Sequence, residues 1–207
     1  MEVAVSVLKR RDSLEDAIDK INVSSAKYLH IDVMDGTMTK ATSEDYDADT
    51  LKKSVLPIQL HLMSKKPLLL IEKYRDVPLD TIVVHAEIEG VCEVISAIKT
   101  RGYKCGLAIN PYTELEVLLK YIDIVDTVLV MTVIPGEGGQ KMINSTLYKI
   151  DALRMKRDEG RLNFKIVVDG GVNEDTVCLV KNADIVVSGS YIAMHSNYEG
   201  QIKKLLE

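Results

Sequence analysis

The chain has 207 residues, a formal net charge of −5 and 46% hydrophobic residues, with no tryptophan and one phenylalanine. This length favours one domain, residues 1–207, and the acidic balance argues against a nucleic-acid surface, which needs clustered lysine and arginine. No apolar run approaches a membrane span, and the start of the chain has no basic segment leading into an apolar stretch. Three widely spaced cysteines suit a reducing compartment. We therefore expect a cytoplasmic protein that contacts neither nucleic acid nor membrane.

Strand-like and helix-like segments alternate along the chain. The predicted strands cover residues 3–7, 28–32, 58–62, 81–85, 105–109, 127–132, 165–169 and 185–188. The helices predicted after them cover residues 12–21, 48–54, 67–74, 91–101, 113–121, 144–159, 174–181 and the segment from 197 onward. Apolar β-branched runs indicate the strands. Caps such as Ser13 and Thr113, Pro67 in a first turn and Gly102 after a last turn indicate the helix ends.

Eight strand–helix units predict parallel pairing, right-handed crossovers and closure as a single (β/α)₈ barrel. An open doubly wound sheet is the alternative, and it would usually carry one phosphate-binding turn after its first strand. Here the glycine-rich turns follow the sixth, seventh and eighth predicted strands, where barrels commonly bind phosphate. This placement favours the barrel. Residues 37–50 form the longest irregular segment, which we expect to be a lid beside the second strand.

Two histidines and two aspartates fall near strand ends. His30 and Asp32 share one face of the second strand because alternate residues point the same way. His61 ends the third strand and Asp169 the seventh. In a barrel, the ends of several strands supply the catalytic groups. These four side chains are therefore predicted to bind one divalent cation; zinc is favoured, with iron, manganese or cobalt as alternatives.

The two aspartates also suit a proton transfer. A carboxylate on one side of a sugar could remove a proton from the carbon next to a ketone, and an acid on the other side could return one. A metal ion could stabilise the enediolate formed in between. Asp32 and Asp169 are expected on opposite sides of the barrel mouth, so inversion at that carbon is the predicted outcome.

Three glycine-rich turns predict a phosphate site. Glycines adopt backbone angles closed to other residues and expose consecutive N–H groups. The turns contain Gly136, Gly138 and Gly139, then Gly170 and Gly171, then Gly189 and Ser190. Helix starts, which attract anions, follow the second and third of them.

Other side chains near strand ends leave more than one interpretation open. Met34, Met63 and Met131 are interpreted as core packing, or as an apolar ring that keeps water from a reactive intermediate. His85 is interpreted as a structural histidine rather than a site residue.

In their order and spacing, these segments resemble the ribulose-phosphate 3-epimerase family from Ser6 to Ser190. The matching segments are His30-Ile31-Asp32-Val33-Met34-Asp35-Gly36, His61-Leu62-Met63, His85-Ala86-Glu87, Gly106-Leu107-Ala108-Ile109-Asn110-Pro111, Met131-Thr132-Val133, Pro135-Gly136, Gly138-Gly139-Gln140, Val168-Asp169-Gly170-Gly171-Val172 and Gly189-Ser190.

The resemblance implies a (β/α)₈ TIM barrel of the ribulose-phosphate-binding type and interconversion of D-ribulose 5-phosphate and D-xylulose 5-phosphate, a step of the pentose phosphate pathway. It implies metal ligands at His30, Asp32, His61 and Asp169, with Asp32 and Asp169 as the acid–base pair. Contacts to substrate or phosphate are implied for Ser6, His61, Gly136, Glu137, Gly138, Gly139, Asp169, Gly170, Gly171, Gly189 and Ser190, and the three methionines match positions that line the site. A sugar phosphate is the expected partner, and we expect a homo-oligomer.

The chain departs from the family pattern around the mouth. Residues 37–41 replace a His-Phe-Val-Pro-Asn stretch, Glu137 replaces an aromatic residue, Ile134 an acidic one and Val5 a proline. Glu137 would repel a phosphate if its side chain pointed inward, so we predict that it points to solvent.

These departures leave the sugar open, with a 3-epimerase of D-allulose 6-phosphate, a hexulose phosphate, as the main alternative. A decarboxylase or synthase of the same superfamily would carry an Asp-x-Lys-x-x-Asp pattern, whereas Asp32-Val33-Met34-Asp35 has no lysine. A non-catalytic sugar-phosphate-binding barrel is a further alternative.

Overall fold

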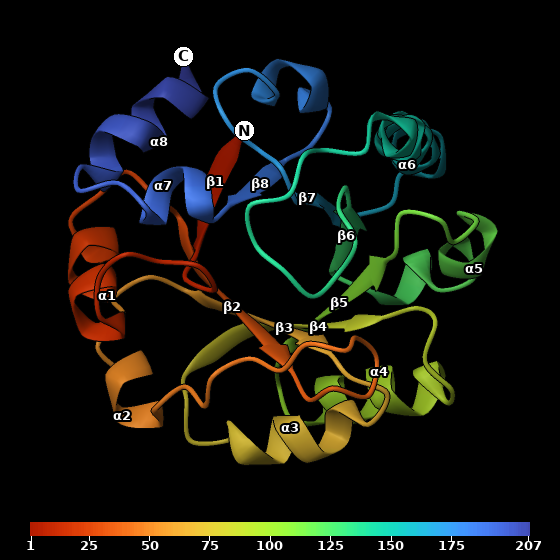
Figure 1. The fold of residues 1–207 in the computed structure, drawn as a ribbon. Coiled ribbons are helices and arrows are strands. Elements are labelled where there is room, and N and C mark those ends of the chain that lie inside the picture. The colour runs from red at the N-terminus through yellow and green to blue at the C-terminus, as the bar shows by residue number, and fades with distance from the viewer.

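The computed structural model describes residues 1–207, and its eight parallel strands close into a barrel in sequence order, with the last strand paired to the first (Figure 1). The strands are β1 (Glu2–Ser6), β2 (Tyr28–Met34), β3 (Ile58–Met63), β4 (Leu79–His85), β5 (Lys104–Ile109), β6 (Thr127–Met131), β7 (Lys165–Asp169) and β8 (Ile185–Ser188). The predicted (β/α)₈ TIM barrel is confirmed. Parallel pairing between consecutive strands places all their carboxyl ends at one mouth.

Helices surround the barrel. The α-helices are α1 (Leu14–Asn22), α2 (Ala48–Leu51), α3 (Pro67–Lys73), α4 (Val91–Thr100), α5 (Glu116–Leu119), α6 (Leu147–Gly160), α7 (Ser190–Ala193) and α8 (Tyr198–Leu206). Three 3₁₀ segments are η1 (Ile122–Ile124), η2 (Asn144–Thr146) and η3 (Val177–Val180). None of the helices combines the length and the apolar character needed to cross a lipid bilayer.

The helix predicted over residues 113–121 is wrong in extent, because α5 begins only at Glu116 and η1 follows it. A helix starting at Thr113 would use the Thr113 carbonyl for the N–H of Val117. That carbonyl instead accepts from Lys149 Nζ at 2.7 Å, and Val117 donates to Glu114. Lys149 also donates to the carbonyls of Asn110 and Pro111, so this buried amine fixes the loop after β5.

The helix predicted over residues 174–181 is also wrong in type, because only the 3₁₀ segment η3 forms there. Asn173 Oδ1 accepts from the N–H groups of Asp175 and Thr176, and Thr176 Oγ1 donates to the carbonyl of Gly171. Side-chain bonds of this kind compete with the backbone bonds of an α-helix. The helix start predicted after the Gly189-Ser190 turn is present as α7, although the predicted helix ranges included only the segment from 197 onward.

The core has two layers. A cluster of 50 buried hydrophobic residues fills the space between strands and helices, and a cluster of 9 lies within the barrel. On β2, Leu29, Ile31 and Val33 join the outer layer, which leaves His30 and Asp32 to face the interior. The interior is therefore uneven: β5 to β8 fill it with residues such as Leu129 and Val167, whereas β2 to β4 bring histidines.

Two loops meet over the mouth. The loop after β2 is anchored by Asp35, which accepts from Thr37 and from Ser64 Oγ at 2.5 Å. It then runs beside the loop after β6, where a Cβ added to Gly136 would lie 3.4 Å from Thr39 Cβ. The first part of the predicted lid thus lies against the β6 loop, at the front of the barrel in Figure 1.

Candidate active site and metal centre

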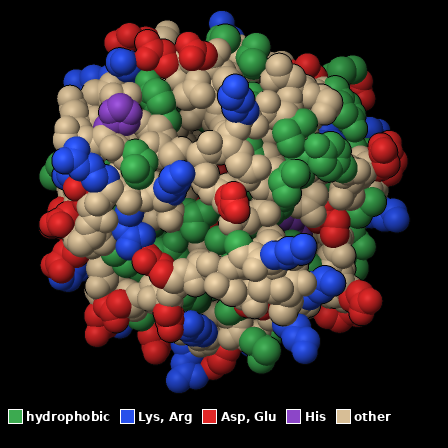
Figure 2. All heavy atoms as spheres, viewed as in Figure 1, with side chains coloured by type: hydrophobic (Ala, Val, Ile, Leu, Met, Phe, Trp, Pro, Cys, Tyr) green, Lys and Arg blue, Asp and Glu red, His purple; other side chains and the backbone are tan.

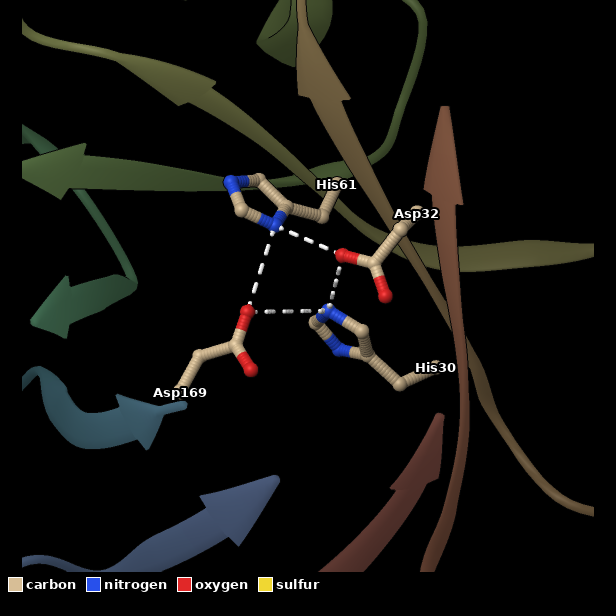
Figure 3. Close-up of side chains that lie close together, drawn as sticks. All are labelled: His30, Asp32, His61 and Asp169. Carbon is tan, nitrogen blue, oxygen red and sulfur yellow. Dashed lines mark hydrogen bonds and ion pairs between the residues drawn. The ribbon is translucent and has the colours of Figure 1, made fainter. Parts of the chain in front are cut away.

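The four predicted ligands converge at the carboxyl ends of β2, β3 and β7 (Figure 3). One donor atom from each of His30, Asp32, His61 and Asp169 lies within 4.8 Å of the other three. His61 Nδ1 is 3.0 Å from Asp32 Oδ1 and 3.5 Å from Asp169 Oδ2. His30 Nε2 is 3.3 Å and 3.9 Å from the same two oxygens. The register of β2 and β3 sets Asp32 directly beside His61.

The electrostatics of this cluster favour a positive charge at its centre. Burial alone would lower the pKa of His61, but the carboxylates of Asp169 and Asp32 raise it to about 9. Burial also opposes a charge on His30, yet Asp32 and Asp169 raise its pKa above the usual value. Burial would raise the pKa of Asp32, and the two histidines lower it. A group placed between these side chains is therefore most stable when it is cationic.

The cluster fits a divalent metal ion. His30 Nε2 is buried and has no hydrogen-bond partner, which leaves a lone pair directed at the centre of the group. Four donors around one zinc ion at about 2.1 Å would be about 3.4 Å apart, and the observed separations between histidine nitrogens and carboxylate oxygens bracket that value. Imidazole and carboxylate donors also suit iron, manganese and cobalt.

His85 holds one of these ligands from behind. Its ring stacks on His61 with centroids 5.1 Å apart, and the two Nε2 atoms are 3.0 Å apart. A metal-binding Nδ1 on His61 requires the proton on Nε2, so His61 donates to His85. His85 then carries its own proton on Nδ1, which is 3.4 Å from Glu87 Oε2. Burial lowers the pKa of His85, in agreement with a neutral ring. The structural role predicted for His85 thus includes a direct contact with the site.

Ser6 orients Asp32 from β1. Its Oγ donates to Asp32 Oδ2 at 2.6 Å and accepts from the N–H of Leu8. This contact leaves Asp32 Oδ1 facing both histidines. The serine predicted to touch substrate therefore also fixes a predicted ligand.

A cavity of about 340 Å³ opens above the cluster, and Figure 2 shows a hollow near the centre of this face with basic and acidic side chains at its edge. The predicted residues that line it are Ser6, Asp32, Met63, Met131, Gly136, Glu137, Gly138, Gly139, Asp169, Gly170, Gly171, Gly189 and Ser190. His30 and His61 are fully buried beneath it. Met34 is buried as well, beside Ser43, and does not line the cavity.

The glycine turns form the side of the cavity opposite β2 and β3. Gly170 has φ +120° and Gly171 φ +65°, both in the region that favours glycine. A Cβ on Gly170 would lie 2.4 Å from Val133 Cγ2, and one on Gly171 would lie 2.5 Å from the Met142 nitrogen. These contacts exclude any side chain, so backbone groups alone form this part of the wall.

Some lining residues were not predicted. Lys9, Lys141, Asn173 and Tyr191 all border the cavity. A single lysine after a strand belongs to no motif, and only the folded chain brings Lys9 to the glycine loop. Glu137 is exposed, as predicted, but it also borders the cavity.

The chain matches the model of the ribulose-phosphate 3 epimerase family over residues 2–193. It belongs to the ribulose-phosphate 3-epimerase family. The chain is similar to the ribulose-phosphate 3-epimerase of Bacillus subtilis. The two are 35% identical over 212 residues, which cover 99% of this chain and 98% of that protein. The ribulose-phosphate 3-epimerase of Treponema pallidum is 35% identical over 201 residues, 94% of this chain and 89% of that protein.

Solved structures outside the ribulose-phosphate 3-epimerase family share the fold. Phosphoribosyl anthranilate isomerase from Thermococcus kodakaraensis superposes with a TM-score of 0.65 at 16% identity, over 99% of this chain and 96% of that one. A 3-hexulose-6-phosphate synthase superposes with a TM-score of 0.65 at 14% identity, over 99% and 98%. At such identities the likeness concerns the barrel alone.

Proposed function

We propose that this protein interconverts D-ribulose 5-phosphate and D-xylulose 5-phosphate by inverting carbon three, with one divalent metal ion held by His30, Asp32, His61 and Asp169. One observation carries the proposal: two carboxylates from opposite sides of the mouth meet at the base of a cavity whose other wall is glycine backbone. Membership of the ribulose-phosphate 3-epimerase family supports the same reaction.

The two aspartates would move the protons. The ionised carboxylate of one removes the proton from carbon three, and the electron pair of the broken C–H bond forms the enediolate with the neighbouring ketone carbon. The carboxylic acid of the other returns a proton to the opposite face of carbon three, which inverts it. A bound cation would stabilise the negative charge that develops on the two sugar oxygens.

The remaining residues would hold the substrate. The N–H groups of the turns at Gly138, Gly170 and Gly189 would bind the phosphate, because glycine exposes its backbone to an anion. Met63 and Met131 line the cavity and would keep water from the reacting carbons. Ser6 and His85 would keep Asp32 and His61 in position.

A 3-epimerase of D-allulose 6-phosphate is the second candidate. A further cavity of about 530 Å³ lies beside the first, between the loops after β2, β5 and β6. It is lined by Thr39, Lys40 and Ala41, which fall in the segment that departs from the family pattern. This space could admit a sugar with one more carbon.

The test is turnover of both sugar phosphates by protein stripped of metal and reloaded with zinc, iron, manganese or cobalt. We expect a metal-dependent epimerase with the higher kcat/KM on D-ribulose 5-phosphate, and deuterium from solvent at carbon three of recovered substrate or product. A preference for the hexulose phosphate would support the second candidate. Binding of both sugars without deuterium exchange would instead support the non-catalytic barrel and contradict an enediolate.

A further inference from the structure

Lys9 extends from the loop after β1 across the glycine loop after β6. A Cβ added to Gly138 would lie 3.0 Å from Lys9 Cβ, and one added to Gly139 would lie 3.2 Å from Lys9 Nζ. The same position on Gly139 is 3.6 Å from Ser190 Oγ. The Lys9 ammonium thus lies where the loop after β6 meets the turn after β8.

This ammonium group is free. Arg10, the next residue, is paired with Glu44 at 2.6 Å, whereas Lys9 makes no ion pair and no hydrogen bond within the chain. Lys9 lines the same cavity as Asp169 and Gly170. An unpaired cation beside exposed N–H groups is suited to a phosphate, to which lysine adds a point charge and up to three donors.

The loop after β6 also carries an acidic side chain that has no ion-pair partner. Glu137 lies within the glycine loop, lines the same cavity and has no cationic partner. A phosphate dianion bound there would be repelled by Glu137, and the neutral backbone groups of the three turns would not offset that charge. Lys9 is placed beside the next two residues of the same loop, where it can do so.

We infer that Lys9 is a phosphate-binding residue of this site that offsets the negative charge of Glu137. The inference rests on the proposed function for the identity of the sugar, but not for binding of the anion. Lys9 is not among the residues for which the resemblance implies contacts to substrate or phosphate.

Binding of inorganic phosphate tests the inference without turnover. Calorimetry on the metal-loaded protein should give a dissociation constant about tenfold weaker for Lys9→Met than for the unmodified protein, because one charge-assisted contact is lost. Lys9→Arg should stay within about threefold. Lys27→Met is the matched control, since this exposed lysine lies at the start of β2, at the other end of the barrel. Equal affinity of Lys9→Met and the unmodified protein would overturn the inference, as would an equal loss in Lys27→Met.

Kinetics separate this inference from the proposed function. With the sugar phosphate, Lys9→Met should raise KM about tenfold and leave kcat within about twofold, since the proton-transfer groups are untouched. A fall in kcat with no change in KM would contradict a binding role. If the unmodified protein binds phosphate through Lys9 yet epimerises no sugar phosphate, the proposed reaction fails and the binding residue stands.

Discussion

The two sides of the barrel mouth differ in whether side chains or backbone groups form them. On the side of β2, β3 and β4, buried side chains are fixed by one another, as in the chain from Glu87 through His85 to His61. On the side of β6, β7 and β8, the wall is glycine backbone in exposed or half-exposed turns. The proposed chemistry therefore depends on the identity of buried side chains, whereas the proposed phosphate binding depends on the path of the backbone and on Lys9. The departure from the family pattern at Glu137 lies on the second side, and the four proposed metal ligands on the first side and at Asp169 are all present.

Asp169→Asn tests the residue that joins the two sides, because Asp169 ends β7 but is proposed to act with His30, Asp32 and His61 of β2 and β3. Loss of one of two acid–base groups and of one metal ligand should reduce kcat by at least about 10³-fold. The side chain is at the rim, 14% exposed, so the barrel should stay folded. An epimerisation assay coupled to a second enzyme measures kcat. Circular dichroism, followed through thermal unfolding, shows whether the variant is folded. Turnover close to that of the unmodified protein would remove Asp169 from the mechanism.

Gly170→Ala tests the dependence of the phosphate side on backbone path. The added Cβ meets Val133 at 2.4 Å and forces alanine to φ +120°, so we expect a loss of about 3 kcal/mol in the free energy of unfolding. Gly189→Ala is the milder change, because its Cβ would meet Ser6 at 3.4 Å and its φ of −100° is negative, while its ψ of −93° lies outside the helical region. That variant should lose less than about 1 kcal/mol. Urea titrations of both variants decide the point, and equal losses would contradict it.

Glu87→Gln sharpens the comparison on the metal side. Glu87 Oε1 accepts from the Asn110 N–H and Oε2 faces His85 Nδ1, but glutamine has only one acceptor oxygen. If that oxygen keeps the Asn110 N–H, an NH2 group faces His85 Nδ1, and the tautomer that leaves His61 Nδ1 free is less favoured. Metal affinity should fall about 10-fold to 100-fold, as measured by competition with a chelator. Glu89→Gln, an exposed change two residues further along the chain, is the control. Unchanged affinity in Glu87→Gln would exclude this positioning role.

Asp184 directly precedes β8, away from both sides of the mouth, so its substitution should change stability but not catalysis. Burial would raise the pKa of Asp184, but hydrogen bonds from Arg157 and the Ile166 N–H lower it. A carboxyl with a lower pKa in the folded chain stabilises the fold above its unfolded pKa of about 3.9, and that contribution is lost as the pH falls below it. Asp184→Asn should therefore cost about 1 kcal/mol at pH 7 and progressively less below pH 4, with kcat unchanged. Unfolding titrations at several pH values measure this, and a cost independent of pH would contradict it.

The sequence predicted the fold and the convergence of the two histidines and two aspartates because both follow from the strand pattern. The alternation of apolar runs and helical segments indicated eight units, and the period of two along His30-Ile31-Asp32 put both ligands inside the barrel. The Lys149 contacts that shorten α5 and the position of Lys9 on the glycine loop join residues distant in the chain. No local pattern carries such information, and the contact of His85 with His61 likewise depends on the register between β3 and β4.

The position of Asp169 at the end of β7 has a consequence for how the protein matures. Three of the proposed ligands lie on β2 and β3, whereas the fourth ends β7, so the donor set is complete only after most of the chain has left the ribosome. The N-terminal half alone would offer an ion only three protein donors, and water would occupy the remaining coordination position. An ion held by all four donors would therefore stabilise the closed barrel more than any partly folded N-terminal segment, by mass action.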